Sequence, residues 1–201
     1  MRQQDVIEFF NRCAPAWDDG LVTDDHIIAR ILDRAGIGAG CRVLDVACGT
    51  GVLFPYYLCR DVASVTGIDI SPEMANIASG KYKGEPRIGV VCGDAENWEF
   101  PGRFDAVVVY NAFPHFLHPE RLIAHLSSLL CPGGTLTVAH GASRESIDAH
   151  HRGSASHVSR GLMHIEELRS LFAEHLTVET LISDDKMYQV TGRKVTRQNG
   201  N

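Results

Sequence analysis

The stretch that decides the fold is Val43-Leu44-Asp45-Val46-Ala47-Cys48-Gly49-Thr50-Gly51, and Gly67-Ile68-Asp69-Ile70-Ser71 follows it. The first stretch predicts a buried strand that runs into a glycine loop, and the second predicts a strand that ends in an acidic residue. Glycine lets the backbone adopt positive φ and approach a ligand closely. An acidic residue at the end of the next strand is placed to accept hydrogen bonds from ribose hydroxyls. The two stretches together predict a site for a cofactor that carries a nucleoside.

Strand-like and helix-like segments alternate along the rest of the chain. Apolar runs predict strands at 42–47, 64–70, 88–92, 105–110 and 135–139. Apolar residues at helical spacing predict helices at 5–13, 24–35, 51–60, 72–82, 119–130 and 165–173. The strands are continuous apolar runs rather than alternating ones, which is typical of a parallel sheet covered on both faces.

A few positions predict where these elements end. Thr23 is the expected cap of the second helix, and Gly36 is its expected end. Pro132-Gly133-Gly134 predicts a hard turn before the fifth strand. Residues 176–183 and 187–193 flank a polar turn, so we expect them to pair as an antiparallel hairpin.

The composition is that of one ordinary globular domain. The chain has 201 residues, 44% of them hydrophobic, and a formal net charge of -6, which predicts a single domain over 1–201 with a substantial core. The acidic balance and the lack of a Lys/Arg run argue against nucleic-acid or anionic-membrane partners. Six cysteines stand singly, and no apolar run has the length of a membrane helix or a signal peptide. We therefore expect a cytoplasmic protein, either a monomer or a homodimer.

The acidic residues narrow the choice of nucleoside. The glycine pair of residues 49–51 would suit NAD, but that fingerprint needs a third glycine where this chain has Phe54. Carboxylates follow three successive strands, at Asp45, Asp69 and Asp94. Three carboxylates would surround a pyrophosphate with negative charge. They suit a cationic ligand that carries an amine, a ribose and an adenine.

The motifs in order resemble the class I S-adenosylmethionine (SAM)-dependent methyltransferases, and especially the branch that includes ubiquinone- and menaquinone-biosynthesis enzymes. The resemblance rests on residues 43–51, 67–71, 93–97, 104–116 and 129–138, with a similar opening at 10–18. It implies a Rossmann-like doubly wound α/β fold with a mainly parallel seven-stranded sheet and an antiparallel C-terminal strand. It also implies methyl transfer from SAM to a small-molecule acceptor by direct displacement, which leaves S-adenosyl-L-homocysteine (SAH).

The same resemblance implies roles for individual residues. Asp45 and the glycines would hold the methionine part of SAM, Asp69 the ribose, and Asp94 with the Ala95 backbone the adenine. Trp17 would help close the pocket, as part of N-terminal helices over 1–36 that cover the cofactor. The implied cofactor-binding residues are Trp17, Asp45, Ala47, Gly49, Gly51, Asp69, Ile70, Asp94, Ala95 and Asn111.

Histidines set this chain apart from the family pattern. His115 follows the fourth strand. His140 directly precedes a polar segment at 141–164, and His151 lies within it. We interpret this segment as a substrate lid with a short helix near 144–151. These three histidines are the candidate catalytic residues on the acceptor side, because a positioned His is the commonest general base. The histidines of the segment would bind a divalent metal, or recognise a polar or anionic acceptor together with Arg144, Arg152 and Arg160, or belong to a solvated loop.

Two other functional classes stay open at this point. One is a non-catalytic SAM- or SAH-binding module, perhaps metal-responsive through the His-rich segment, because such a module needs the same glycine loop. The other is an NAD(P)-dependent oxidoreductase. The sequence does not identify the acceptor atom. The resemblance implies a quinone, whereas the polar lid favours a hydrophilic acceptor.

Overall fold

A seven-stranded sheet forms the centre of the protein. The computed structural model describes residues 1–151 and 156–196, apart from the side chains of residues 150 and 151. The strands of the sheet are β1 (Arg42–Val46), β2 (Ser64–Asp69), β3 (Ile88–Cys92), β4 (Phe104–Tyr110), β5 (Leu130–His140), β6 (Thr177–Ser183) and β7 (Tyr188–Arg193). Their order is β3-β2-β1-β4-β5-β7-β6, with β1 to β5 parallel and β7 antiparallel to both of its neighbours. The predicted Rossmann-like doubly wound fold, with its antiparallel C-terminal strand, is confirmed.

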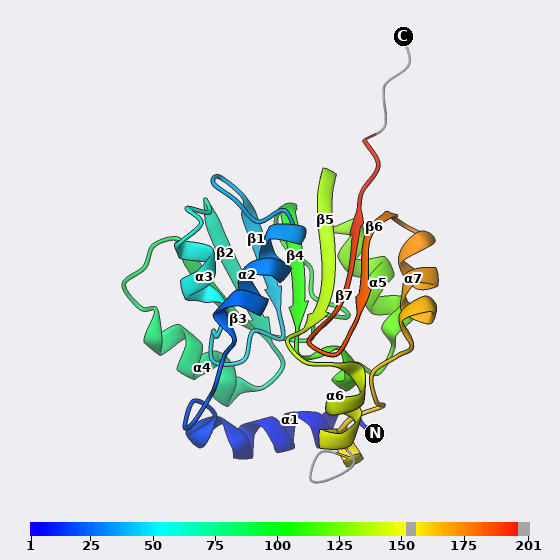
Figure 1. Ribbon diagram of the computed structural model, residues 1–201. Coiled ribbons are helices and arrows are strands. Elements are labelled where there is room, and N and C mark those ends of the chain that lie inside the picture. The colour runs from blue at the N-terminus through cyan, green and yellow to red at the C-terminus, as the bar shows by residue number, and fades with distance from the viewer. Residues whose placement is uncertain (152–155, 197–201) are drawn as a thin grey trace.

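Helices cover both faces of this sheet (Figure 1). On one face lie α2 (Asp25–Arg34), α3 (Phe54–Leu58) and α4 (Pro72–Lys81), and on the other lie α5 (Pro119–Ser128) and α7 (Ile165–Ala173). Two further helices, α1 (Gln3–Cys13) and α6 (Arg144–His151), lie across the edge at which the parallel strands end. Short 3₁₀ turns at Ala14–Ala16, Phe113–His115 and Ser156–Val158 complete the helical elements of the described ranges.

The alternation of side chains along β1 divides the core between the two faces. Leu44 and Val46 pack into the cluster that contains the α5 and α7 side chains, whereas Val43 packs into the cluster of α2 and α3. Asp45 shares the face of Val43, because successive strand residues point to opposite sides. A carboxylate is thereby buried against Tyr57 of α3, a fact that matters for the site.

Two predicted element ends are wrong in detail. Asp24, not Thr23, caps α2: its side chain accepts a hydrogen bond from the Ile27 backbone N–H at 3.0 Å. The predicted turn at 132–134 lies inside β5, which starts at Leu130, because Gly133 and Gly134 exchange backbone hydrogen bonds with the Lys194 backbone. The turn residues are accommodated by a register shift against β4 and a positive φ of 80° at Gly133.

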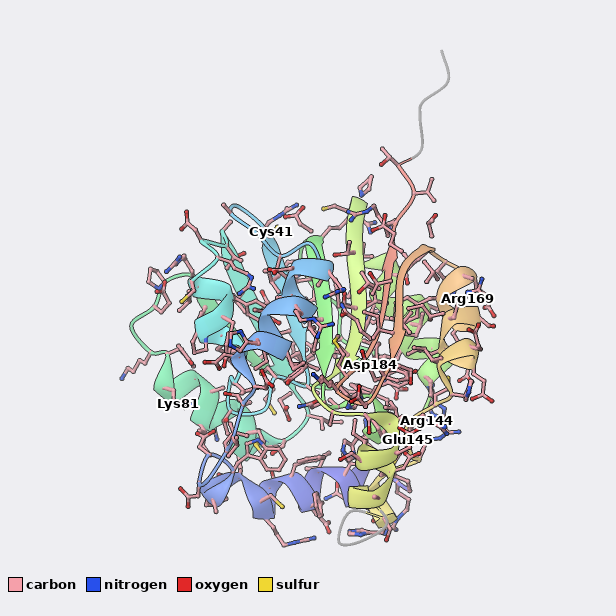
Figure 2. All side chains as sticks on the ribbon, viewed as in Figure 1. Cys41, Lys81, Arg144, Glu145, Arg169 and Asp184 are labelled. Carbon is pink, nitrogen blue, oxygen red and sulfur yellow. The ribbon has the colours of Figure 1, made fainter. Side chains whose placement is uncertain are left out.

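The surface gives no sign of a membrane span. Within the described ranges, no helix is both long enough and apolar enough to cross a bilayer. Charged side chains such as Lys81, Arg169 and Asp184 project from the outside of the molecule (Figure 2).

Candidate functional site

A cavity lies at the carboxyl ends of the parallel strands, beneath α1 and α6. This cavity of about 530 Å³ is lined by the loops after β1, β2, β3, β4 and β5, together with side chains of α1 and α6. The volume falls within the range of small-molecule sites. Open α/β sheets bind ligands at this edge, because the strand order reverses there and the loops diverge.

Backbone atoms of the loop after β1 form part of the cavity wall. Ala47 and Gly49 both adopt positive φ, 54° and 55°, and both line the cavity. A side chain added at Gly49 would stand 3.9 Å from Trp17 Nε1, so the glycine leaves room between the loop and the indole. Gly51 does not line the cavity. A Cβ there would come within 2.8 Å of the Phe54 ring, so this glycine serves helix packing.

Asp69 is the best-positioned carboxylate of the cavity. Its side chain is buried and accepts the backbone N–H of Gly49 and that of Ser71, each at 2.8 Å. Burial raises the pKa of Asp69, and the two backbone hydrogen bonds oppose that rise. Each carboxylate oxygen retains a second lone pair. The group is therefore rigidly held and able to accept from two hydroxyls of a ligand.

Asp94 ties the N-terminal helix to the far end of the cavity. Its Oδ2 accepts Gln3 Nε2 of α1 at 2.9 Å and Asn97 Nδ2 at 2.6 Å. Ser71 Oγ similarly donates to Asn11 at 2.7 Å. These contacts place α1 over the β2 and β3 loops, so the predicted covering role of this segment has a structural basis in side-chain contacts.

Ile70, Ala95 and Asn111 also line the cavity, and their contact with a cofactor stays a prediction. Asn111 is a strand-end residue with a φ of 53°, and its Oδ1 accepts the Gly141 backbone N–H at 3.0 Å. This bond joins the β4 and β5 loops. The β4 and β5 carboxyl ends are therefore held together on the side of the cavity opposite Asp94.

Asp45 stands behind the cavity rather than in its wall. Burial, and after it the charge of Asp69, raises the pKa of Asp45 well above its usual range. Asp45 Oδ2 and the Tyr57 hydroxyl are buried and interact electrostatically, yet neither forms a hydrogen bond of normal geometry with the described residues. The resemblance implies that Asp45 lies near the SAM ammonium, directly or through a water, and its position behind the cavity favours the water. A buried polar atom without a hydrogen bond marks a place where a ligand group or a water belongs.

Two of the three predicted catalytic histidines line the cavity. His115 Nδ1 lies 2.7 Å from the Val158 carbonyl oxygen, and the Phe10 ring packs on the imidazole edge with centroids 5.0 Å apart. A carbonyl only accepts, so Nδ1 carries the proton and Nε2 carries the lone pair of the neutral ring. His140 is buried at the end of β5 beside Tyr188. The side chain of His151 lies outside the described residues.

Sequence reasoning missed several cavity residues. Glu96 is buried, and its Oε1 accepts the backbone N–H groups of Leu117 and His118 at 3.0 and 3.1 Å. Burial raises the pKa of Tyr110, another lining residue, to about 12. A signal for both existed, because Glu96 lies in the 93–97 motif and Tyr110 directly precedes Asn111.

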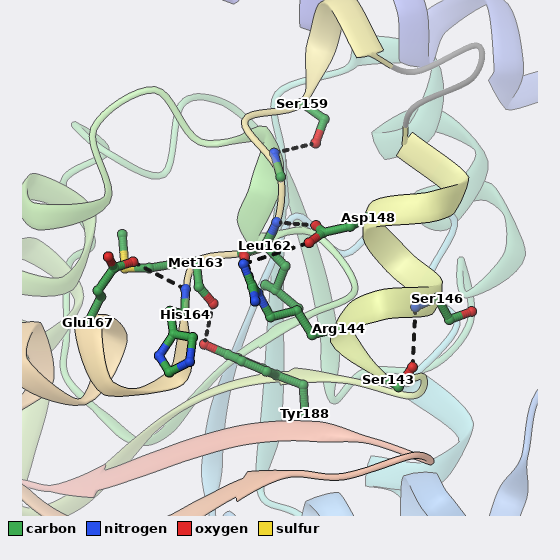
Figure 3. A network of polar contacts seen from close by, with 11 residues as sticks. Ser143, Arg144, Ser146, Asp148, Ser159, Leu162, Met163, His164, Glu167 and Tyr188 are labelled. Carbon is green, nitrogen blue, oxygen red and sulfur yellow. Dashed lines mark hydrogen bonds and ion pairs between the residues drawn. The ribbon is translucent and has the colours of Figure 1, made fainter.

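The arginines expected to recognise an acceptor are directed elsewhere. Arg144 Nε donates to the Leu162 carbonyl at 2.9 Å, and its guanidinium lies 3.8 Å from Asp148 (Figure 3). Arg160 donates from its backbone to Pro114 and from its side chain to the Leu117 carbonyl. Both arginines line a second cavity behind the β4 loop and not the first, so their role toward an acceptor stays a prediction. Arg152 lies outside the described residues.

Metal ligation finds no support in the part of the chain that the structure describes. There, His, Cys, Asp and Glu side chains form no group of three or more arranged to hold a metal ion. Because the side chains at 150 and 151 are not described, the metal-responsive interpretation of the His-rich segment stays a prediction.

Comparison with protein families matches residues 43–134 to a family described as "Methyltransferase domain". A ubiquinone biosynthesis O-methyltransferase of Xanthomonas campestris is 38% identical over 115 residues, covering 56% of this chain and 46% of the relative. A demethylmenaquinone methyltransferase of Tropheryma whipplei is 32% identical over 142 residues, covering 67% of this chain and 58% of the relative. The chain thus spans about half the length of the curated relatives it matches.

A solved structure shares the whole fold. The N-methyltransferase NodS of Bradyrhizobium japonicum, determined with S-adenosyl-L-homocysteine, superposes with a TM-score of 0.73 at 18% identity. The likeness covers 94% of this chain and 98% of that one. At this identity it supports the fold alone.

Proposed function

We propose that the protein is a class I SAM-dependent methyltransferase that transfers the methyl group of SAM to a small-molecule acceptor, a proposal supported by the family match over residues 43–134. The observation that carries the proposal is Asp69, a buried carboxylate facing a strand-end cavity and held there by the Gly49 backbone N–H. A donor with hydroxyls and positive charge suits such a group. NAD(P) does not, because its pyrophosphate would meet the carboxylates of the cavity.

Residues of the cavity can be assigned to each part of SAM: the adenine, the ribose and the methionine part. We assign the ribose hydroxyls to Asp69, and the adenine to Ile70 and the Asp94–Ala95 segment. The Gln3 amide already bonds Asp94 Oδ2, so we expect Gln3 to shift or to share that oxygen when adenine binds.

The methionine part is assigned to the loops on the other side of Asp69. Ala47, Gly49 and Asn111 would surround it, with Trp17 closing the cavity above. Asp45 would act from behind the loop, through a bound water that reaches its buried Oδ2. Gly51 would shape the loop without touching the donor.

SAM supplies a methyl group already activated by the positive sulfur that bears it. The remaining work of the protein is to orient the acceptor, exclude water and take up a proton. His115 is suited to the last task, because the Val158 carbonyl holds its Nδ1–H and leaves Nε2 as the basic nitrogen. His140 and His151 are further proposed members of the acceptor side.

Two segments are proposed as covers of the site. The N-terminal residues 1–36 would cover the donor, and residues 141–164 would cover the acceptor as a lid. Ser146 and Ile147 of α6 line the cavity, and Val158 packs against Val6 of α1, so the described parts of the two covers touch.

The proposal is tested by SAH binding and by turnover of SAM to SAH with a panel of acceptors. We expect calorimetry to detect one SAH site, and SAH to form faster when a true acceptor is present. No SAH binding, together with tight binding of a nicotinamide dinucleotide, would refute the proposal. Binding without turnover on any acceptor would favour the second candidate, a non-catalytic SAM- or SAH-binding module.

A further inference from the structure

The charges around the cavity are all of one sign among the residues described there. The lining includes four carboxylates, at Asp24, Asp69, Asp94 and Glu96, and none of its described members is Lys or Arg. Of the two described arginines of the lid, Arg144 bonds to the Leu162 carbonyl and lies near Asp148 (Figure 3). Arg160 donates to the Leu117 carbonyl. Among the described residues of the lining, no Lys or Arg offsets these carboxylates, so an anionic acceptor gains no attraction there from the protein.

The four carboxylates of the cavity lining have different partners and different assigned roles. Asp69 and Asp94 lie where the proposed function places ribose and adenine, and Glu96 accepts two backbone N–H groups of the β4 loop. Asp24 lies in the segment before α2 and interacts electrostatically with Tyr110 at the end of β4. Of its two oxygens, Oδ1 accepts the Ile27 backbone N–H as a helix cap. Asp24 is thus the lining carboxylate that the proposed function assigns neither to the donor nor to the β4 loop.

An apolar rim adjoins Asp24. Leu21 and Val22 line the cavity yet are 47% and 92% exposed. Large apolar side chains exposed at a cavity rim mark a surface that binds an apolar group. This part of the lining therefore combines apolar contact area with one carboxylate.

We infer that the methyl acceptor is an amine carried on an apolar body, which enters the cavity as an ammonium ion beside Asp24. The inference rests on the proposed function. In the reaction the ammonium first loses a proton to a base, for which His115 Nε2 is placed. The amine lone pair then forms the N–C bond while the S–C bond of the donor breaks, and sulfur keeps the electron pair. Positive charge passes from sulfur to nitrogen, and the methylated product leaves as an ammonium ion.

The test compares three probes of similar size on the SAH-saturated protein, with affinities measured by calorimetry and by saturation-transfer NMR. The probes are phenethylamine, phenethyl alcohol and hydrocinnamate, which differ chiefly in charge. We expect phenethylamine to bind tightest and hydrocinnamate weakest. SAH alone is titrated first, so that failure to bind SAH counts against the proposed function and is separate from the ranking of the probes.

Two variants make the test specific to Asp24. Asp24→Ser removes the charge but keeps a good helix cap, and it is expected to weaken phenethylamine binding by about 3- to 5-fold, the scale of a partly exposed ion pair. Asp25→Asn is the matched control: it removes the neighbouring charge, which bonds Tyr56 outside the cavity lining, and should leave all three probes unchanged.

Several results would overturn the inference. They are hydrocinnamate or phenethyl alcohol binding as tightly as phenethylamine, no detectable phenethylamine binding, or equal losses for the amine and the alcohol in Asp24→Ser. Amine binding that depends on Asp24 and not on Asp25 supports it. Methylation of the amine, measured as SAH release, would extend that support from binding to chemistry.

Discussion

Replacing Asp69 by alanine separates the ligand role of this carboxylate from its structural role. In the folded protein its two oxygens accept the backbone N–H groups of Gly49 and Ser71, each at 2.8 Å. The substitution removes both acceptors and leaves two backbone donors at the cavity edge. It also removes the only group assigned to the ribose hydroxyls of the donor.

The expected magnitudes follow from these contacts. A hydrogen bond to a charged group contributes about 1.5–3 kcal/mol, but the raised pKa of Asp69 shows that burying this carboxylate carries a cost. We therefore expect the free energy of unfolding to fall by about 2–4 kcal/mol, rather than by the full sum of two bonds. Loss of the ribose acceptor should weaken SAH binding by about 100-fold, which corresponds to about 3 kcal/mol.

The assay is isothermal calorimetry with SAH, combined with urea unfolding of each variant. Asp184→Ala is the matched control, because Asp184 also accepts two backbone N–H groups, those of Lys186 and Met187, in the turn between β6 and β7. Asp184 is exposed and does not belong to the cavity lining. This control should lose stability and keep its SAH affinity.

An unchanged SAH affinity in Asp69→Ala would refute the ribose assignment. Equal affinity losses in the Asp69 and Asp184 variants would also refute it, since the loss would then follow stability rather than a ligand contact. Titrations are carried out well below the unfolding temperature of the weaker variant, so that each measurement reports on folded protein.

Three further predictions test other parts of the site. His115→Gln is expected to lower turnover by about 100-fold, the scale of general-base catalysis, with SAH affinity nearly unchanged; equal losses would move His115 out of the acceptor side. Asp45→Asn tests the raised pKa of Asp45: the wild type takes up a proton on folding, so this contribution to stability is present at low pH and is lost as pH rises through the folded-state pKa. The Asn variant cannot ionise, so its unfolding free energy relative to wild type should increase from pH 5 to pH 8, and a constant difference by urea unfolding would contradict this. Gly51→Ala should cost about 2–4 kcal/mol of stability, from strain at a φ of 85° and a clash with a neighbouring ring; an unchanged urea midpoint would show that the loop relaxes freely.

The order and type of the elements were predictable because they follow from local patterns. Continuous apolar runs identified the strands, and the hairpin at the C-terminus followed from two such runs around a polar turn. The errors lie where a partner decides the outcome. Asp24 replaces Thr23 as the cap because only its side chain reaches the Ile27 N–H, and the 132–134 turn joins β5 because the Lys194 backbone pairs with it.

The candidate site was predictable to the extent that strand ends define it. Asp69, Asp94 and Asn111 end or follow parallel strands, so the chain order alone places them at one edge of the sheet. Gln3 escaped prediction because its position depends on a contact with a distant segment. Gln3 reaches Asp94 across 91 positions of sequence, and no local signal marks such a pair.

The amino-acid sequence by itself determined the doubly wound fold, the glycine loop and the three carboxylates at the strand ends, because short-range spacing and strand order suffice for them. Only the tertiary structure decided which way side chains point. It turned Asp45 behind the loop and Arg144 toward Leu162, and it left a cavity whose described charges are all negative. Side-chain direction depends on packing between elements far apart in the chain. The inference that the acceptor is an amine rests on these side-chain directions.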